Sequence, residues 1–124
     1  MSHKNKKQFG VWMDSRNATV VGKEGFDGEF VIIESIVNAG PDNNSNENAA
    51  NNQEKTLTQK FFKEIAAKMP NVEVLHVTGT GQIQEQFIKF LSETPQFKNV
   101  QSTESTSNKM SDESLALFMK DHFN

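Results

Sequence analysis

The chain of 124 residues contains no cysteine, and this absence removes several chemistries at once. Disulfide bonds, thiol nucleophiles and cysteine-ligated zinc are excluded, and the composition fits a reducing compartment. The sequence also lacks any apolar run near the roughly 18 residues that a membrane-spanning helix needs, and no apolar segment follows its basic start. We therefore expect a soluble, cytoplasmic protein without a membrane partner.

A surplus of positive charge is also missing. Lysine and arginine number 13 against 16 acidic residues, and the net charge is −3. Broad coating of nucleic-acid phosphates needs a basic face, so the composition argues against it. No group of residues forms a strong catalytic or metal-binding signature, and the sequence implies no cofactor.

What is present is a regular alternation of apolar segments and turns. The length fits a single domain over residues 1–124, beginning with a polar arm at residues 1–7. Short β-rich segments separated by turn residues predict an antiparallel meander. We predict its strands at Gln8–Met13, Ala18–Val21 and Phe30–Val37.

Strict alternation within the third predicted strand would place its apolar residues on two sides. Val31 and Ile33 would share one side, and Ile32 and Ile36 would share the other. Trp12, in the first strand, is expected to be at least half buried.

The polar bias of the chain is concentrated in residues 38–55. Asn38–Gln53 is rich in asparagine and has no large apolar residue. Such a segment cannot offset the entropy of ordering by burial, so we expect a mobile loop.

Helical and strand patterns alternate after this loop. Leu57, Phe61, Ile65 and Met69 recur at a spacing of four residues, which predicts a helix over Thr56–Met69 that ends at Pro70. The remaining predicted elements are a buried strand at Val72–Thr78, a helix at Gln82–Ser92, a weak edge strand at Lys98–Thr103 and a last helix capped by Ser111.

The resulting order, β-β-β-α-β-α-β-α, predicts an α/β protein with a mixed sheet and helices packed on it. This order matches the ribonuclease-H-like fold.

Three segments also carry a family resemblance. Phe9–Val21, Leu57–Met69 and Val72–Leu91, with the long loop between the first two, resemble the middle domain of eukaryotic and archaeal peptide-chain release factors and of their relative pelota. The resemblance is closer still to small bacterial stand-alone release-factor-like proteins, sometimes labelled translational machinery proteins. It covers roughly Gln8–Phe123 and implies an interaction with ribosomes or tRNA.

One departure from that family bears on activity. Release factors carry Gly-Gly-Gln in the loop before the first helix, and this motif enters the peptidyl-transferase centre. Here the corresponding loop has only Gly40, Gln53 follows Asn51 and Asn52, and Gly-Gly-Gln occurs nowhere in the chain. The resemblance therefore implies a module without peptidyl-tRNA hydrolysis, and we expect a protein that is not an enzyme.

Asp14 supports an alternative function. It follows the first strand, where ribonuclease-H-like nucleases hold a metal ligand, so a metal-dependent nuclease is one alternative. The available partner carboxylates are Glu34, Glu73, Asp112 and Glu113, and none stands in a signature of its own. Asp is equally a common opening residue of a turn, and we favour this structural role.

Two further features could contact an anion such as RNA phosphate. Gly79, Thr80 and Gly81 open a helix after a strand, where backbone N–H groups can bind an anion, although a tight glycine turn is the simpler interpretation. Lys4, Lys6 and Lys7 form a small basic arm, which a solvated terminus also explains.

The histidines form no ligand pattern. His76 lies in the middle of an apolar strand and is expected to be a hydrogen-bonded core or sheet-face residue. His122, near the end of the last helix, could interact with that helix's carbonyl groups.

Three functions remain open from the sequence. They are a non-enzymatic ribosome- or tRNA-associated module, a nuclease built around Asp14, and a protein-binding module that pairs through an exposed sheet edge near Lys98–Thr103.

The composition of Asn38–Gln53 generates a first prediction. Replacing this segment with a short Gly/Ser linker should leave the melting temperature, measured by circular dichroism, within a few degrees of the parent, because no large apolar side chain is lost. A large fall in melting temperature would show that the segment packs on the rest of the protein.

Overall fold

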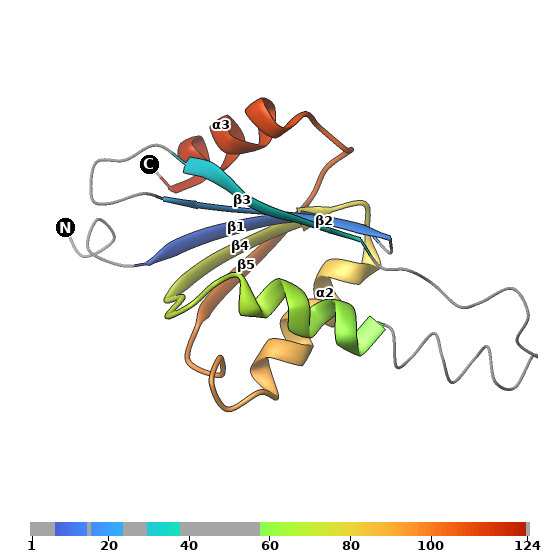
Figure 1. The fold of residues 1–124 in the computed structure, drawn as a ribbon, viewed down its shortest axis with the longest axis vertical. Coiled ribbons are helices and arrows are strands. Elements are labelled where there is room, and N and C mark those ends of the chain that lie inside the picture. Colours follow the sequence, from blue (N-terminus) through green and yellow to red (C-terminus); the bar gives the residue numbers. More distant parts are fainter. Residues whose placement is uncertain (1–6, 15, 24–29, 38–57, 124) are drawn as a thin grey trace, which may run out of the picture.

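The computed structural model describes residues 7–14, 16–23, 30–37 and 58–123 (Figure 1). The predicted mobile loop at residues 38–55 and most of the predicted N-terminal arm lie outside these residues.

A five-stranded mixed sheet forms the centre of the fold. Its spatial order is β3-β2-β1-β4-β5, with β1 between β2 and β4. β1 pairs antiparallel with β2, which pairs antiparallel with β3, whereas β4 runs parallel to both β1 and β5. This is the predicted ribonuclease-H-like arrangement. The strands are β1 (Gln8–Met13), β2 (Asn17–Lys23), β3 (Phe30–Val37), β4 (Val74–Gly79) and β5 (Gln101–Thr106).

Helices cover both faces of the sheet (Figure 1). The helix at residues 58–67 and α2 (Gln82–Ser92) pack on one face, while α3 (Asp112–Phe123) packs on the other. None of the helices within the described residues is long and apolar enough to cross a bilayer.

Each face has its own apolar core. The larger core combines alternate residues of β1 with the helix at 58–67 and α2, including Val11, Phe61 and Phe87. The smaller core lies under α3 and contains Trp12 and Met119. Trp12 is only 2% exposed, which confirms the predicted burial of that side chain.

β1 belongs to both cores because every one of its residues is buried. The strand is short and predominantly apolar, as expected for a strand covered on two faces. Gly10 allows α3 to approach closely, since a Cβ at that position would overlap the side chain of Met119.

Several predicted boundaries agree with the structure, namely those of β1, β3 and α2. The expected strand at Lys98–Thr103 is displaced, because β5 begins only at Gln101. Residues before it form turns instead, with Phe97 N–H donating to Thr94 O and Val100 N–H donating to Phe97 O. These hydrogen bonds delay the extended conformation by three residues.

The expected alternation in β3 is wrong. An irregularity of register between Val20 and Val21 pairs Val21 with Ile32 but Val20 with Glu34, so Ile33 is an extra residue. A β-bulge of this kind shifts the alternation of all later side chains. Ile32 therefore packs on the core beneath α3, whereas Ile36 belongs to the opposite core.

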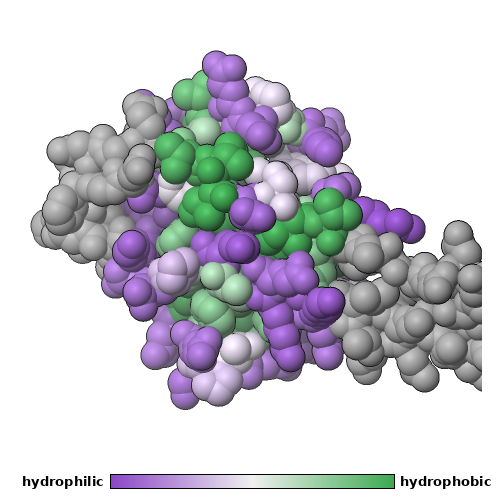
Figure 2. All heavy atoms as spheres, viewed as in Figure 1, coloured by the Kyte–Doolittle hydropathy of each residue, from purple (hydrophilic) through white to green (hydrophobic). Residues whose placement is uncertain are grey.

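The two edges of the sheet differ in character. β3 exposes apolar side chains, with Val31 at 40%, Ile33 at 39% and Val37 at 68% exposure. Figure 2 shows apolar side chains in the band where β3 crosses the visible face. β5, at the other edge, has the polar sequence QSTEST.

The turn after β4 generates a second prediction. A Cβ at Gly79 would overlap the carbonyl oxygen of Met13, a backbone atom that cannot move aside cheaply. Gly79→Ala should lower the free energy of unfolding by about 1–3 kcal/mol in urea denaturation, the usual cost of overpacking.

Thr80→Ala is the matched control. Thr80 lies in the same turn and its side chain is exposed, so the unfolding midpoint of this variant should stay near that of the parent. Equal midpoints for the two variants would contradict the proposed close contact between β4 and β1.

Candidate functional site

Polar side chains gather where β4 and β5 face α3. The parallel pairing sets His76 beside Thr103 and Thr78 beside Ser105. Because alternate residues of a strand share a face, these four side chains lie together on the α3 side of the sheet. Ser107 joins them through its contact with Thr78. We call these four hydroxyl residues (Thr78, Thr103, Ser105 and Ser107) together with His76 the hydroxyl cluster.

His76 is the centre of this cluster and is only 2% exposed. Its Nδ1 lies 2.8 Å from Thr103 Oγ1, and its Nε2 lies 2.9 Å from Ser105 Oγ. Ser105 Oγ donates to Thr78 Oγ1 at 2.9 Å, and Thr78 Oγ1 lies 2.7 Å from Ser107 Oγ. Across the described part of the chain, no buried side-chain nitrogen or oxygen lacks a partner.

α3 closes the cluster from above. The His122 ring stacks on the His76 ring with a centroid distance of 3.7 Å, and Phe118 lies 5.9 Å away. Burial of the imidazole, and secondarily the neighbouring His122, lower the pKa of His76 from 6.5 to about 4. His76 is thus a hydrogen-bonded, buried sheet-face residue, as predicted.

The contact of Ser105 with His76 resembles that of a nucleophile with its general base, but His76 is poorly suited to act as that base. A general base works best when its pKa lies near the working pH, whereas burial lowers the pKa of His76 to about 4. A threonine hydroxyl, not a carboxylate, holds the second ring nitrogen. We infer that the hydroxyl cluster joins β4, β5 and α3.

Asp14 is occupied by its own turn. Its Oδ1 accepts hydrogen bonds from the backbone N–H groups of Arg16 at 2.8 Å and Asn17 at 2.6 Å. The Asp14 N–H in turn donates to Asn17 O at 2.8 Å. This side-chain-to-backbone pattern is the structural role that turn-forming Asp residues play.

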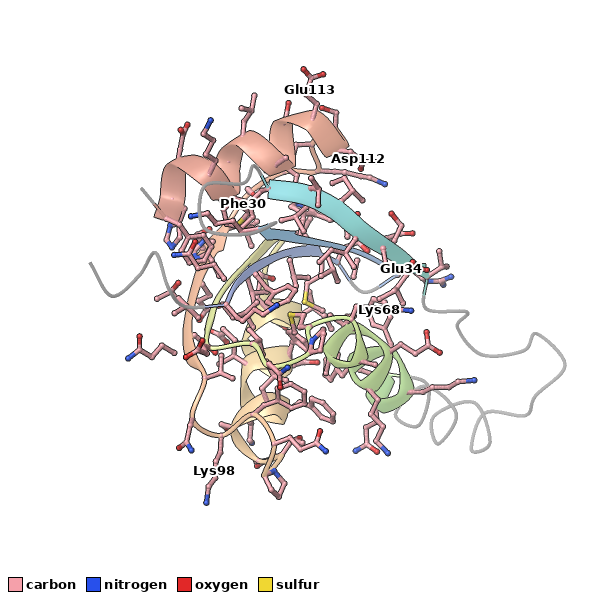
Figure 3. All side chains as sticks on the ribbon, turned by 60° about the vertical axis from the view of Figure 1, so that its left-hand side comes forward. Phe30, Glu34, Lys68, Lys98, Asp112 and Glu113 are labelled. Atoms are coloured by element: carbon pink, nitrogen blue, oxygen red, sulfur yellow. The ribbon has the colours of Figure 1, made fainter. Side chains whose placement is uncertain are left out.

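The other candidate carboxylates come from three places in the fold, namely β3, the residue before β4 and the start of α3. Figure 3 shows Asp112 and Glu113 at the start of α3, and Glu34 on β3 near Lys68. Glu73 Oε1 accepts the backbone N–H of Lys7 at 3.0 Å. Within residues 7–14, 16–23, 30–37 and 58–123, no three histidine or acidic side chains are arranged to hold a metal ion.

The glycine turn after β4 is held by a buried amide that the sequence analysis missed. Gln84, which is fully buried, accepts the Gly81 N–H through Oε1 at 3.1 Å. Its Nε2 donates to Ser105 O at 2.9 Å, so one side chain joins the turn, α2 and β5. The Gly81 N–H is therefore already used within the protein. The sequence signal that could have revealed this role is the position of Gln84, a polar residue on the apolar side of the predicted helix.

Of the basic arm, only Lys7 is described. Its carbonyl oxygen accepts the N–H groups of Glu73 and Val74, which continues the pairing of β1 with β4. Lys4 and Lys6 lie outside the described residues.

A groove of about 350 Å³ lies between β3 and the helix at 58–67. Its lining mixes apolar and charged side chains, and Glu34 and Lys68 lie near each other in Figure 3. The groove is lined by Glu34, Ser35, Ile36, Val37, Glu64, Ala67 and Lys68.

The fold has counterparts among solved structures. Pelota of Archaeoglobus fulgidus matches 98% of this chain with a TM-score of 0.61 and 17% identity, and an archaeal translation termination factor, aRF1, matches 96% with a TM-score of 0.59 and 11% identity. This chain has the fold of part of pelota and aRF1. It spans 32% and 35% of those two chains. No protein-family model and no curated protein sequence matches it.

A resolvase of fowlpox virus matches with a TM-score of 0.40 and 13% identity. This similarity is too low to support the nuclease alternative.

The hydrogen bonds of Asp14 generate a third prediction. Asp14→Asn should retain the turn and the stability of the parent, since the Asn side-chain oxygen can accept the same N–H groups. Asp14→Ala should lose about 1 kcal/mol in thermal or urea unfolding.

The same variants separate the structural role from a nuclease. Parent and Asp14→Asn are incubated with single- and double-stranded DNA and RNA in Mg²⁺ or Mn²⁺. We expect no cleavage by either protein. Cleavage by the parent that disappears in Asp14→Asn and in EDTA would establish metal-dependent chemistry at this residue.

Proposed function

We propose that this protein is a non-enzymatic interaction module related to the middle domains of release factors and pelota, and that it binds ribosomes or tRNA. The observation that supports this most is the extent of the structural match. Nearly the whole chain superposes on about a third of a translation termination factor and of pelota. The match concerns the fold alone, so binding to ribosomes or tRNA has to be tested by experiment.

Two observations support a function without enzymatic activity. The sequence contains no Gly-Gly-Gln, the motif that the resemblance links to peptide release. Among the described residues, the histidine that contacts a serine hydroxyl is His76, which lies beneath α3 and whose pKa burial lowers to about 4. A function by binding requires neither feature.

A protein partner is a second candidate, and the two sheet edges favour different sites for it. We expected edge pairing near Lys98–Thr103, but β5 is short and polar there. β3 carries Val31, Ile33 and Val37 at the opposite edge. An added strand gains main-chain hydrogen bonds and apolar contacts, which makes β3 the better-suited edge.

Sedimentation through a sucrose gradient tests the fourth prediction. In an extract from cells that express the tagged protein, it should comigrate with ribosomal particles. EDTA, which separates the subunits, should then move it to the subunit fractions. A protein that stays at the top of the gradient in both conditions, and does not pellet with purified ribosomes, would contradict the ribosome part of the proposal.

The same ribosome preparation measures catalysis. Ribosomes loaded with peptidyl-tRNA should release no peptide when the purified protein is added. Release that is lost in Gln53→Ala would overturn the non-enzymatic part of the proposal and would locate the chemistry in the residues before the helix at 58–67.

A further inference from the structure

Few side chains of α3 are fully buried against the sheet. Leu115 and Met119 are fully buried, and Ala116, Phe118 and Phe123 are partly buried against the same core. The Phe123 ring also stacks on Phe30 with 5.5 Å between the ring centroids. Residues 107–111, which lead into the helix, have no regular secondary structure. Segments with few buried apolar contacts open at a lower free energy than the rest of a fold.

The C-terminal turn of α3 adds the His76–His122 stack to this attachment. One ring is buried in the sheet face and the other comes from the helix, with 3.7 Å between their centroids. Two protonated imidazoles at this distance repel each other, and His76 cannot take water as a compensating partner while α3 covers it.

Among the residues that the structure describes, the groups that contact His76 include no carboxylate to balance such a charge. β1 presents Gly10 at the paired position, β5 presents the hydroxyl groups of Thr103 and Ser105, and α3 presents the rings of Phe118 and His122. On α3, Asp112 is exposed and stands ten residues before His122, about 15 Å along the helix. The other charged residues of α3 are Glu113, Lys120 and Asp121.

We propose that the His76–His122 stack is an acid-sensitive latch for α3. When the pH falls, α3 leaves the sheet while the sheet and the helices on its opposite face stay folded. The movement uncovers the apolar surface that contains Trp12, Val21 and Phe30. This inference is independent of the ribosome proposal, because it concerns only contacts within the chain.

The direction of the pH dependence follows from proton linkage. Under α3, His76 takes up a proton only near pH 4, whereas in water an imidazole takes one up near pH 6.5. Between these values the open form binds one more proton than the closed form. Each step to lower pH in this interval therefore favours the open form, and the effect saturates below pH 4.

Trp12 reports the opening directly, because it is the one tryptophan of the chain. It is 2% exposed beneath α3, and its Nε1 donates to Asn108 O at 3.2 Å in the segment leading to that helix. We expect the Trp12 emission maximum to shift to longer wavelength between pH 6.5 and 4, with the slope of a single proton. The wavelength is measured because a charged imidazole can also quench the intensity.

Amide hydrogen exchange by NMR distinguishes opening from global unfolding. The amides of α3 should lose protection across the same pH interval, while those of β1 and the helix at 58–67 keep theirs. A Trp12 shift that occurs only together with loss of β1 protection would overturn the latch.

Three variants locate the proton. His76→Gln keeps one donor and one acceptor for the hydroxyl cluster but cannot titrate, so its emission profile should be flat. His122→Phe keeps a stacked ring without a charge, and its midpoint should move to lower pH. His3→Gln removes a histidine outside the described residues and should reproduce the parent profile.

Two results would overturn the proposal. One is a parent emission maximum that stays constant down to pH 4. The other is a pH step that persists unchanged in His122→Phe and, where it folds, in His76→Gln.

Discussion

The burial of β1 on both faces is the constraint on which the rest of the structure depends. The strand pairs with β2 on one side and β4 on the other, so it fixes where the antiparallel part of the sheet meets the parallel part. Val11 faces the larger core and Trp12 faces the smaller one. Gly10 sets how closely α3 can approach, while Met13 O limits the residue allowed at Gly79. The two cores, the approach of α3 and the turn after β4 therefore all depend on the six residues of β1.

Local patterns in the sequence were sufficient for much of the fold. The apolar runs of β1 and β3 and the helical spacing of α2 predicted their bounds correctly, and Ser111 caps α3 as expected, since its Oγ accepts the Ser114 N–H at 3.1 Å. The two errors have different causes. The bulge opposite Val20 depends on how β2 and β3 pair, whereas β5 begins late because turn hydrogen bonds at Phe97 and Val100 precede it. Hydrophobic periodicity carries no information on either feature.

The candidate site was less predictable, because its members become neighbours only through the parallel pairing of β4 and β5. His76 was expected to be hydrogen-bonded, but its stacking with His122 joins residues 46 positions apart (122 minus 76). Two residues that were candidates for metal or anion binding make local hydrogen bonds instead. Asp14 accepts N–H groups of its own turn, and the Gly81 N–H donates to Gln84. The polar interior of this fold thus stabilises its own elements.

The parallel pairing of β1 with β4 also has a consequence for synthesis of the protein. Gln8 pairs with Val74, so the second neighbour of the central strand is translated 66 residues after the strand itself (74 minus 8). At 5–20 residues per second this delay is roughly 3–13 s. β2 and β3 follow β1 within the first 37 residues, so a hairpin meander can form early, but it presents one side of β1 without a partner until β4 emerges. The most buried strand of the finished fold is an open edge for much of its time on the ribosome.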